Sequence, residues 1–425
     1  MGIHTRPAAH ARAWSARTRM CRALVATLAL CIAQALPARE ITERDAVAAA
    51  LSRADYQALE ASRRMAAEAD VEEAAQLPNP RASFAREGFT TAGERTIETS
   101  YELSQQIDVA GRRGLARDAA ALRLLATESE TRGSRNETVA EVRKAFGEAL
   151  YRARIVDALQ VSLRRLASTT GAITRLAQSG EASAYDRRRV EREVMGARVR
   201  RDTAAAELAR SRAMLAAYLE VAQEEVLQPV GSPLPTPPPA LETLRAGLHE
   251  RHDLAALRTR ADAADGELEM ARRAWIPEMT VGIGNRVIEE ARADNDRVML
   301  SLSMPLPVFD RGQPAAKRAA ALREGFRAEH ALRLARLDAS LNGLWQQSTQ
   351  LHASALAFRK DALANSRELT GIARKAYEAG EAGVLDLIDA YRTELDTEML
   401  SLELDFRARL ARIELDQVAG ATLHE

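Results

Sequence analysis

Cysteine is nearly absent from this chain of 425 residues: Cys21 and Cys31 are the only two. Both lie before residue 40, so the rest of the chain is built without disulfides or thiolate metal sites. Aromatic residues are also scarce, at 4% of the sequence. This composition argues against a thick globular core and favours long helices with narrow apolar seams.

An excess of charge of one sign is missing as well. Lys+Arg and Asp+Glu number 60 each, so the formal net charge at pH 7 is zero. Neutralising the phosphates of a nucleic acid needs a basic excess on one face, so we expect no nucleic-acid partner. No apolar run after residue 40 approaches the roughly 18 residues of a membrane-spanning helix. We therefore expect no transmembrane helix in the mature chain.

Signals for catalysis and for bound ions are lacking too. There is no P-loop, no G-x-G-x-x-G, no G-x-S-x-G and no usable Cys/His pair, so we expect neither an enzyme nor a cofactor. The sequence His249-Glu-Arg-His252 is one residue short of the zinc-protease motif H-E-x-x-H and has no third ligand nearby. We interpret it as part of a surface helix and predict no metal-binding residues.

Residues 1–38 have the features of a secretory signal peptide. An apolar run over residues 23–35 follows several arginines and ends in the A-x-A cleavage pattern Ala33-Gln34-Ala35. We predict cleavage near Ala35, with cleavage after Ala38 as the alternative. Three further readings stay open: an uncleaved anchor, initiation at Met20, and acylation of Cys31, although Leu30 is not the small residue expected before an acylated cysteine.

The chain contains an internal repeat. Residues 376–386 align without gaps on residues 176–186, and Ile276-Pro277 aligns with Leu77-Pro78 at nearly the same offset. Matches in a constant order at a near-constant offset predict a tandem duplication of about 200 residues. We predict a first repeat over residues 39–226, a proline-rich linker over 227–240, a second repeat over 241–420 and a tail over 421–425. The linker holds six of the fourteen prolines, which favours a stiff extended segment.

Each repeat reads as a helix, two strands, a long helix, a turn and a second long helix. The strands show apolar residues at every second position. In the second repeat these are Val281, Ile283, Val287, Leu300, Leu302 and Met304, and in the first they are Tyr101 and Leu103, with a weaker strand around Phe84 because Arg86 breaks the apolar face. We expect the charged stretch 289–297 to be a solvated turn. Strands of this kind suit a lipid-facing barrel, although the strands alone would favour an amphipathic hairpin packed on a soluble core.

The long helices are predicted from apolar residues in steps of three and four, as in a coiled-coil seam. In the first repeat the seam is Val142, Phe146, Ala149, Ala153, Val156, Leu159, Leu163, Leu166 and Ile173, and in the second it is Leu334, Leu337, Leu341, Leu344 and Leu351. The first helix, over about residues 113–178, would reach on the order of 100 Å. Gly180 and Gly380 are typical left-handed helix ends, so each helix should turn there and return as an antiparallel partner.

These features resemble the outer-membrane efflux, or TolC-like, family over residues 41–420. The Leu-Pro and Ile-Pro junctions match that family, as do the segment L-P-V-F-D-R-G over residues 306–312 and the tip Y-E-A-G-E-A-G-V-L-D-L-I-D-A over residues 377–390. The L-P-V-F-D-R-G form is most similar to the subgroup that serves heavy-metal pumps of the cobalt-zinc-cadmium type.

The resemblance implies a mainly α protein with a transmembrane β-barrel. In that family a homotrimer builds one 12-stranded barrel from four strands per chain in outer-membrane lipid, and its helices form a tube across the periplasm of a Gram-negative bacterium. The implied function is the exit duct of a tripartite RND-type efflux system, exporting divalent heavy-metal cations with a periplasmic adaptor and an inner-membrane RND transporter as partners. The alternative is a periplasmic coiled-coil adaptor or structural protein.

The resemblance also implies functional residues at the two hairpin tips. Asp386 and Asp389 match aspartates of the pore constriction, where three copies would form two acidic rings; alternatively, they only cap a helix start. The segments that meet the adaptor and transporter are matched by Gly180, Glu181, Ala182 and Tyr185 of the first tip and by Gly380, Glu381, Gly383, Val384 and Leu385 of the second.

Overall fold

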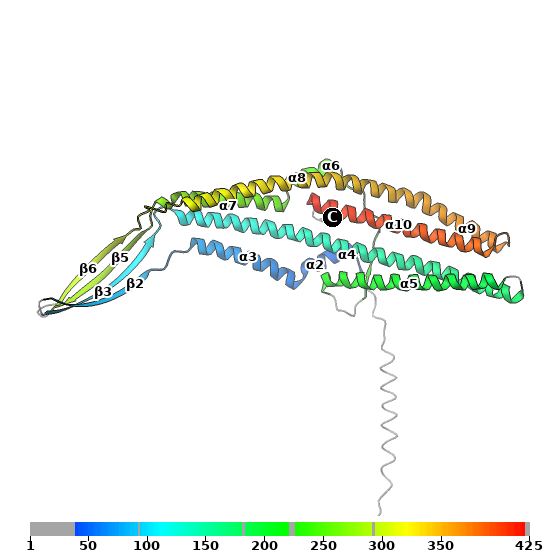
Figure 1. The fold of residues 1–425 in the computed structure, drawn as a ribbon, viewed down its shortest axis with the longest axis horizontal. Coiled ribbons are helices and arrows are strands. Elements are labelled where there is room, and N and C mark those ends of the chain that lie inside the picture. The colour runs from blue at the N-terminus through cyan, green and yellow to red at the C-terminus, as the bar shows by residue number, and fades with distance from the viewer. Residues whose placement is uncertain (1–38, 92–93, 181–182, 221–225, 291–293, 421–425) are drawn as a thin grey trace, which may run out of the picture.

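The computed structural model describes residues 39–91, 94–180, 183–220, 226–290 and 294–420. The predicted signal peptide and the tail over 421–425 lie outside these residues. Figure 1 shows an elongated molecule with a β-sheet at one end and two helical hairpin tips at the other. Among the helices of the described residues, none combines the length and apolarity needed to cross a membrane.

The helices occur in the same order in both halves of the chain. The first half contains α2 (Glu43–Ser52), α3 (Ala54–Ala75), α4 (Arg112–Ser179) and α5 (Ala184–Leu219). The second half contains α6 (Leu241–Leu248), α7 (His252–Arg272), the short 3-10 helix η1 (Arg273–Trp275), α8 (Gln313–Phe358), the π-helical segment η2 (Arg359–Leu363), α9 (Ala364–Glu378) and α10 (Val384–Ala419). The tandem duplication and the boundaries of its two repeats stay a prediction.

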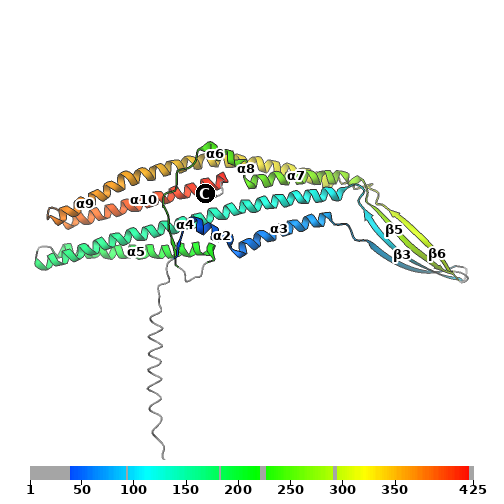
Figure 2. The ribbon, with the colours of Figure 1, turned by 180° about the vertical axis from the view of Figure 1, so that it is seen from behind.

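The first long helix, α4, is continuous, as predicted, and ends at Gly180, whose φ of 83° is left-handed. It lies between α3 and α5 on one side and α7 and α10 on the other (Figures 1 and 2). Most of its apolar seam is buried, most completely at Val142, Phe146 and Ala149, whereas Ala153 and Val156 are half-buried. The second long helix consists of α8, η2 and α9, so a π-helical turn interrupts it. Nothing in the apolar periodicity predicted that interruption.

The sheet joins the two repeats. Its strands are β2 (Arg81–Thr91), β3 (Glu94–Ile107), β5 (Met279–Glu289) and β6 (Asp294–Ser303), and all three pairings, in the order β2-β3-β5-β6, are antiparallel. Leu103 lies opposite Ile283, which lies opposite Leu300. The expected turn over 289–297 was wrong in extent: Glu289 and Asp294 pair with each other, and Arg286 pairs with Arg297. Of these charged residues, Arg297 lies on the polar face, whereas Glu289 and Asp296 lie at the hairpin end of the apolar face.

The two faces of the sheet differ sharply. One face carries large apolar side chains that no other described part of the chain covers: Phe84, Tyr101, Leu103, Val281, Ile283, Val298, Leu300 and Leu302. The other face is polar and includes Ser83, Glu98, Ser100, Glu102, Arg286, Arg297 and Ser301. Strands β2 and β6 are the sheet's edges and have no partner strand on their outer sides within the described chain.

A second, smaller sheet and a group of charges tie the middle of the molecule together. Strand β1 (Arg39–Ile41) pairs in parallel with β4 (Leu227–Pro229), at the start of the proline-rich linker. Arg143 of α4 donates to Glu43 of α2 at 2.6 Å and to Asp416 of α10 at 2.9 Å. Arg409 donates to Glu43 and, at 3.2 Å, to the carbonyl oxygen of Pro233. The amino-terminal segment, both hairpins and the linker therefore share one ion network, which the sequence did not reveal.

Candidate functional site

The first hairpin tip is a short turn between α4 and α5. Gly180 ends α4, Glu181 and Ala182 lie outside the described residues, and Ser183 caps α5. The hydroxyl oxygen of Ser183 accepts a hydrogen bond from the backbone N–H of Asp186 at 3.0 Å. This cap fixes the start of α5 and leaves the neighbouring Tyr185 side chain largely exposed.

The second tip is built differently at its cap. Gly380 is left-handed, with a φ of 75°, and the N–H of Glu381 donates to the carbonyl oxygen of Ala376 at 2.9 Å. Gly383 has an extended backbone and its N–H donates to the carboxylate of Asp386 at 2.9 Å. Because glycine has no side chain to cap α10, the carboxylate of Asp386 alone contributes the side-chain half of this cap.

The two predicted constriction residues lie on the exposed face of α10. Asp386 and Asp389 both face solvent, whereas Val384, Leu387 and Ile388 point to the opposite side of the helix and are buried. Residues three apart share a helix face, which agrees with the predicted pairing of the two aspartates. Asp386 also has the capping role that was considered as the alternative, so the two roles are compatible in one carboxylate.

The buried side of α10 packs on the first hairpin. The apolar cluster that joins the two tips contains Leu163, Leu166, Ile173, Val190, Val194, Ala197, Val384, Leu387, Ile388 and Tyr391, with Tyr377 and Leu385 at its margin. Val384 therefore lies in the interior of the tip and Leu385 is half-buried, while Gly383 and Glu381 are exposed. The docking role of all these residues stays a prediction.

Ion pairs between the hairpins add to this cluster and were missed by the sequence analysis. Glu193 of α5 receives hydrogen bonds from the guanidinium of Arg392 of α10, one of them at 3.2 Å from Nε. Arg165 of α4 donates to Glu394 of α10 at 2.8 Å. The hydrogen bonds and the charge of Arg392 hold the pKa of the buried Glu193 carboxyl below its usual value, although burial alone would raise it. The two hairpins are thus held together by charge as well as by apolar packing.

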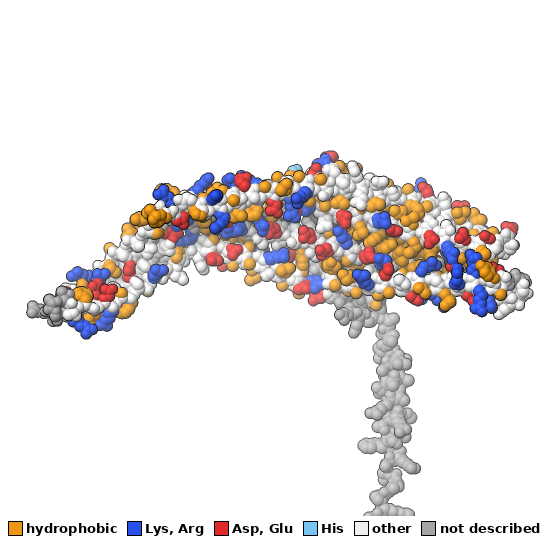
Figure 3. Space-filling model, in the orientation of Figure 1, with side chains coloured by type: hydrophobic (Ala, Val, Ile, Leu, Met, Phe, Trp, Pro, Cys, Tyr) orange, Lys and Arg blue, Asp and Glu red, His pale blue; other side chains and the backbone are white. Residues whose placement is uncertain are grey.

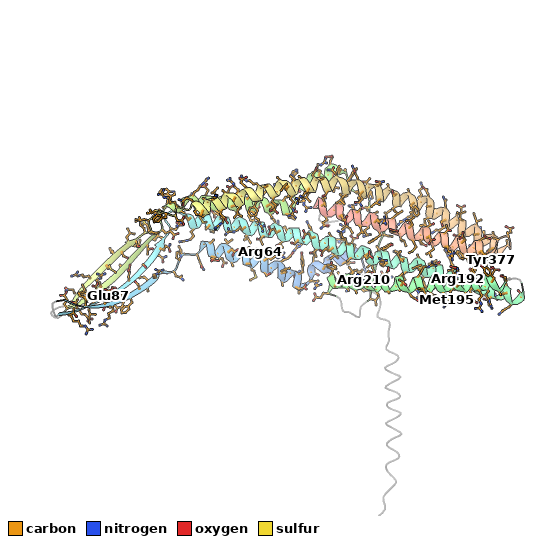
Figure 4. The ribbon with its side chains drawn as sticks, viewed as in Figure 1. Arg64, Glu87, Arg192, Met195, Arg210 and Tyr377 are labelled. Carbon is orange, nitrogen blue, oxygen red and sulfur yellow. The ribbon has the colours of Figure 1, made fainter. Side chains whose placement is uncertain are left out.

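A groove of about 730 Å³ runs between α4, α9 and α10 above this cluster. Its lining includes Thr169, Thr370 and Tyr377, together with the paired Arg165 and Glu394. Figure 4 shows Tyr377 near the tip of the second hairpin and Arg192 and Met195 on α5, at the same end of the molecule. This end of the molecule therefore carries an exposed groove with polar lining residues beside the second tip.

The His249-Glu-Arg-His252 segment is not one helix, contrary to our interpretation. His249 follows the last residue of α6 and His252 is the first residue of α7. The two imidazoles therefore lack the fixed i, i+3 geometry of a continuous helix. Burial, with smaller contributions from Arg132 and Arg251, lowers the pKa of His252, which favours the neutral imidazole.

Comparison with known proteins gives a consistent picture. Residues 244–421 match the model of the family described as outer membrane efflux protein. The cobalt-zinc-cadmium resistance protein CzcC of Cupriavidus metallidurans is 25% identical over 358 residues, which cover 83% of this chain and 84% of CzcC.

Solved structures share the fold. A membrane protein from Pseudomonas aeruginosa superposes with a TM-score of 0.70 at 20% identity, covering 89% of this chain and 93% of its own. CusC gives 0.71 at 17% identity, covering 89% and 92%, and the outer membrane protein VceC from Vibrio cholerae gives 0.68 at 16%, covering 89% and 96%. The predicted fold class, helical with a membrane β-barrel, is confirmed at this level.

The family match and the exposed apolar sheet decide against the alternative of a periplasmic coiled-coil adaptor. They also agree with the prediction that the chain is not an enzyme. Its place is the outer membrane, with the helices in the periplasm. The second half of the chain thus matches the outer membrane efflux protein family, and the chain shares its fold with outer-membrane channels of efflux pumps.

Proposed function

We propose that three copies of this chain form one exit duct for divalent heavy-metal cations, fed by a periplasmic adaptor and an inner-membrane RND transporter. The observation that carries the trimer is the sheet. Four antiparallel strands cannot close a barrel alone, and the unpaired edges β2 and β6 would be costly in lipid. Because β2 and β6 run in opposite directions, joining β6 of one copy to β2 of the next keeps every pairing antiparallel.

Three copies give twelve strands, and the apolar face then points outward into lipid while the polar face lines the lumen. This orientation follows from the faces themselves, because charged side chains such as Glu98 and Arg286 are unfavourable on a lipid-facing surface. The helices of the three copies would continue as a tube whose far end carries the hairpin tips. Docking of the adaptor and transporter is proposed at those tips.

The cargo is inferred from the tip and from a relative. Asp386 and Asp389 are exposed on one face of α10, so three copies would place six carboxylates around the axis. Rings of carboxylates attract cations and exclude anions. CzcC is named for resistance to cobalt, zinc and cadmium, which supports heavy-metal cations as the cargo of this chain too.

The acidic rings are tested by replacing both aspartates of the second tip with uncharged asparagine. Asp386→Asn with Asp389→Asn keeps an oxygen acceptor for the Gly383 N–H but removes the rings. If the two rings together contribute about 1 kcal/mol to the attraction of a cation, the preference for K⁺ over Cl⁻ should fall about fivefold in planar-bilayer recordings of the purified trimer.

Asp186→Asn, which changes the equivalent cap of the first tip, is the matched control and should leave the ion preference closer to that of the wild type. Light scattering of the detergent-solubilised protein reports the trimer independently. A monomer would refute the barrel, whereas a trimer whose ion selectivity ignores the double substitution would refute only the rings. Restored cobalt, zinc or cadmium resistance in a strain lacking its own duct tests the cargo.

A further inference from the structure

A recess of about 530 Å³ lies among the helices directly beside the sheet. It is bordered by the ends of α4, α7 and α8 that adjoin the strands, and these helices lie next to one another in Figures 1 and 2. The volume is within the range of sites that bind small molecules. The hairpin tips lie at the far end of the molecule, so this recess is separate from the constriction and docking residues.

The floor of the recess is apolar and made mainly of small side chains. Ala119, Ala271 and Ala319 are at most 5% exposed, because they pack between neighbouring helices. Helix packing therefore sets the shape of the floor before any ligand binds, and the small side chains leave space for an apolar body. The complete floor consists of Ala116, Ala119, Met270, Ala271, Ala274, Ala315, Ala319 and Leu322.

The carboxylates that line the recess all have partners. Arg112 donates to Glu278 at 2.6 Å, and Arg123 donates to Glu267. Asp108, the remaining acidic residue of the lining, accepts hydrogen bonds from two backbone N–H groups of the turn that leads into α4, at 3.2 and 2.7 Å. These acidic groups are therefore not free to bind a metal cation.

The same recess holds positive charge without a partner. Figure 3 shows side chains of Lys and Arg interspersed with hydrophobic ones on the helices next to the sheet. Two further lining residues, Arg113 and Arg318, have no hydrogen bond or ion pair to any residue that the structure describes, and Arg113 is half-buried. The Nε atom of Arg112 is also buried without a partner in the described part of the chain. Guanidinium groups bind planar oxyanions through two parallel hydrogen bonds, so the recess offers donors for such a group.

The recess continues the polar face of the sheet. Gln106 lies four residues beyond Glu102 on β3, so both side chains are on the polar face. The amide of Gln106 donates to Glu278, which lines the recess. In the barrel proposed above this face lines the lumen, so the recess would open onto the lumen at the level where the barrel meets the helical tube.

We propose that this basic recess binds a small organic anion, whose apolar body lies on the alanine-rich floor and whose carboxylate, sulfonate or phosphate group is held by Arg113 and Arg318. The position in the lumen rests on the barrel proposed above. The binding site does not, because all of its lining residues belong to one chain. The duct would thus carry an anion site beside the sheet in addition to the acidic residues at its tips.

Binding is measured with trifluoromethylbenzoate, an aromatic carboxylate whose fluorine NMR signal reports binding. The mature protein is reconstituted in phosphatidylcholine nanodiscs, and empty nanodiscs give the lipid background. The wild type should bind the probe saturably. Arg113→Gln with Arg318→Gln should weaken binding by at least about tenfold, because two charge-assisted contacts are lost. Ala315→Phe, a change at an exposed position of the floor, should weaken it as well by filling the recess without altering charge.

The matched control is Arg117→Gln with Arg336→Gln. It removes the same charge from α4 and α8, but at exposed residues outside the recess, and should bind the probe as the wild type does. An equal loss of binding in the control would mean general attraction by arginines and would overturn the site. Displacement of the probe by inorganic sulfate at equal concentration would overturn the role of the apolar floor. If the Arg113 and Arg318 variant does not fold, Ala315→Phe still decides the matter.

Bilayer recordings separate this inference from the proposed duct. The probe should reduce the single-channel current of the wild type and leave that of the Arg113→Gln, Arg318→Gln variant unchanged. Saturable binding in nanodiscs without any effect on the current would overturn the position in the lumen and leave the binding site intact. A trimer that conducts ions but shows no binding above the lipid background would overturn the site and leave the duct intact.

Discussion

The two long helices of this chain hold equivalent places in the two predicted repeats but occupy different environments. Helix α4 is unbroken over 68 residues and eighteen of them are buried. Its counterpart α8 buries four of 46 residues before the π-helical turn η2 interrupts it. The reason is position: α4 has neighbours on both sides, whereas α8 lies at the margin of the chain and packs mainly on α7 and α10.

The difference shows that similar apolar periodicity does not imply similar burial. In the first repeat the apolar seam of α4 packs on other helices of the same chain, so a bend in α4 would break these contacts. In the second repeat much of the helix surface, including Leu332 and Leu356, is left exposed. Such a surface is available to further copies of the chain, and the π-helical turn gives this helix a place to bend, because π-turns break the regular hydrogen-bond ladder.

The largest contrast is expected from deleting one residue in each helix. Deleting the exposed Asp361 from η2 removes the extra residue of a π-turn and leaves a regular α-helix with both flanks in register, so assembly should persist. Deleting the exposed Asp157 from α4 rotates all later residues by about 100° relative to their buried partners, so folded protein should be lost. The yield of heat-resistant trimer in the outer membrane measures both. Equal tolerance of the two deletions would contradict the comparison.

A pair of leucine truncations gives a smaller and more quantitative contrast. Leu150 of α4 is 1% exposed in the cluster around α2, so Leu150→Ala should cost about 2 to 5 kcal/mol of unfolding free energy. Leu332 of α8 is 60% exposed, so Leu332→Ala should change the stability of the chain by less than about 0.5 kcal/mol. Melting followed by circular dichroism compares them. If neighbouring copies cover Leu332, its truncation should instead lower the trimer fraction at fixed concentration.

The fold could largely be predicted from the sequence because its signals are periodic and long. The limits of α4 were predicted to within one residue, since proline is absent and glycine ends the helix. The strand ends were predicted less well, because the Asp294–Arg297 stretch is charged, and charged residues at the end of a strand look the same in sequence as charged residues in a turn. The π-helical turn η2 could not be predicted, because it does not interrupt the apolar periodicity of the sequence.

The candidate site was predictable only in part. Glycines and aspartates at the tips could be placed because their spacing fixes a turn and a helix start. The pair formed by Glu193 and Arg392 could not, since it depends on how one hairpin packs on the other and involves residues 199 positions apart. The recess beside Arg113 and Arg318 was equally hidden, because it is formed by helices that are distant in the sequence.

The smallest expected effect concerns two carboxyls in the contacts of α10, Glu193 and Asp405. Their contributions to stability change with pH in opposite directions. The lowered pKa of Glu193, caused mainly by hydrogen bonds from Arg392, means that this pair stabilises the fold above the ordinary glutamate pKa of 4.5 and that the contribution is lost as the pH falls through the lowered value. Burial raises the pKa of Asp405 despite its hydrogen bond from Arg359, so that carboxyl contributes stability below 3.8 and loses it as the pH rises through its raised pKa.

Glu193→Gln should therefore cost about 1 to 2 kcal/mol at pH 7, lower the melting temperature there, and converge on the wild type at acid pH. Asp405→Asn should show the reverse trend, with its most favourable effect relative to wild type at neutral pH, because it removes a buried charge whose Oδ1 has no hydrogen-bond partner among the described residues. Melting curves between pH 3.5 and 7 decide this. A Glu193→Gln deficit that does not shrink on acidification would mean that packing, and not the ion pair with Arg392, holds α5 and α10 together.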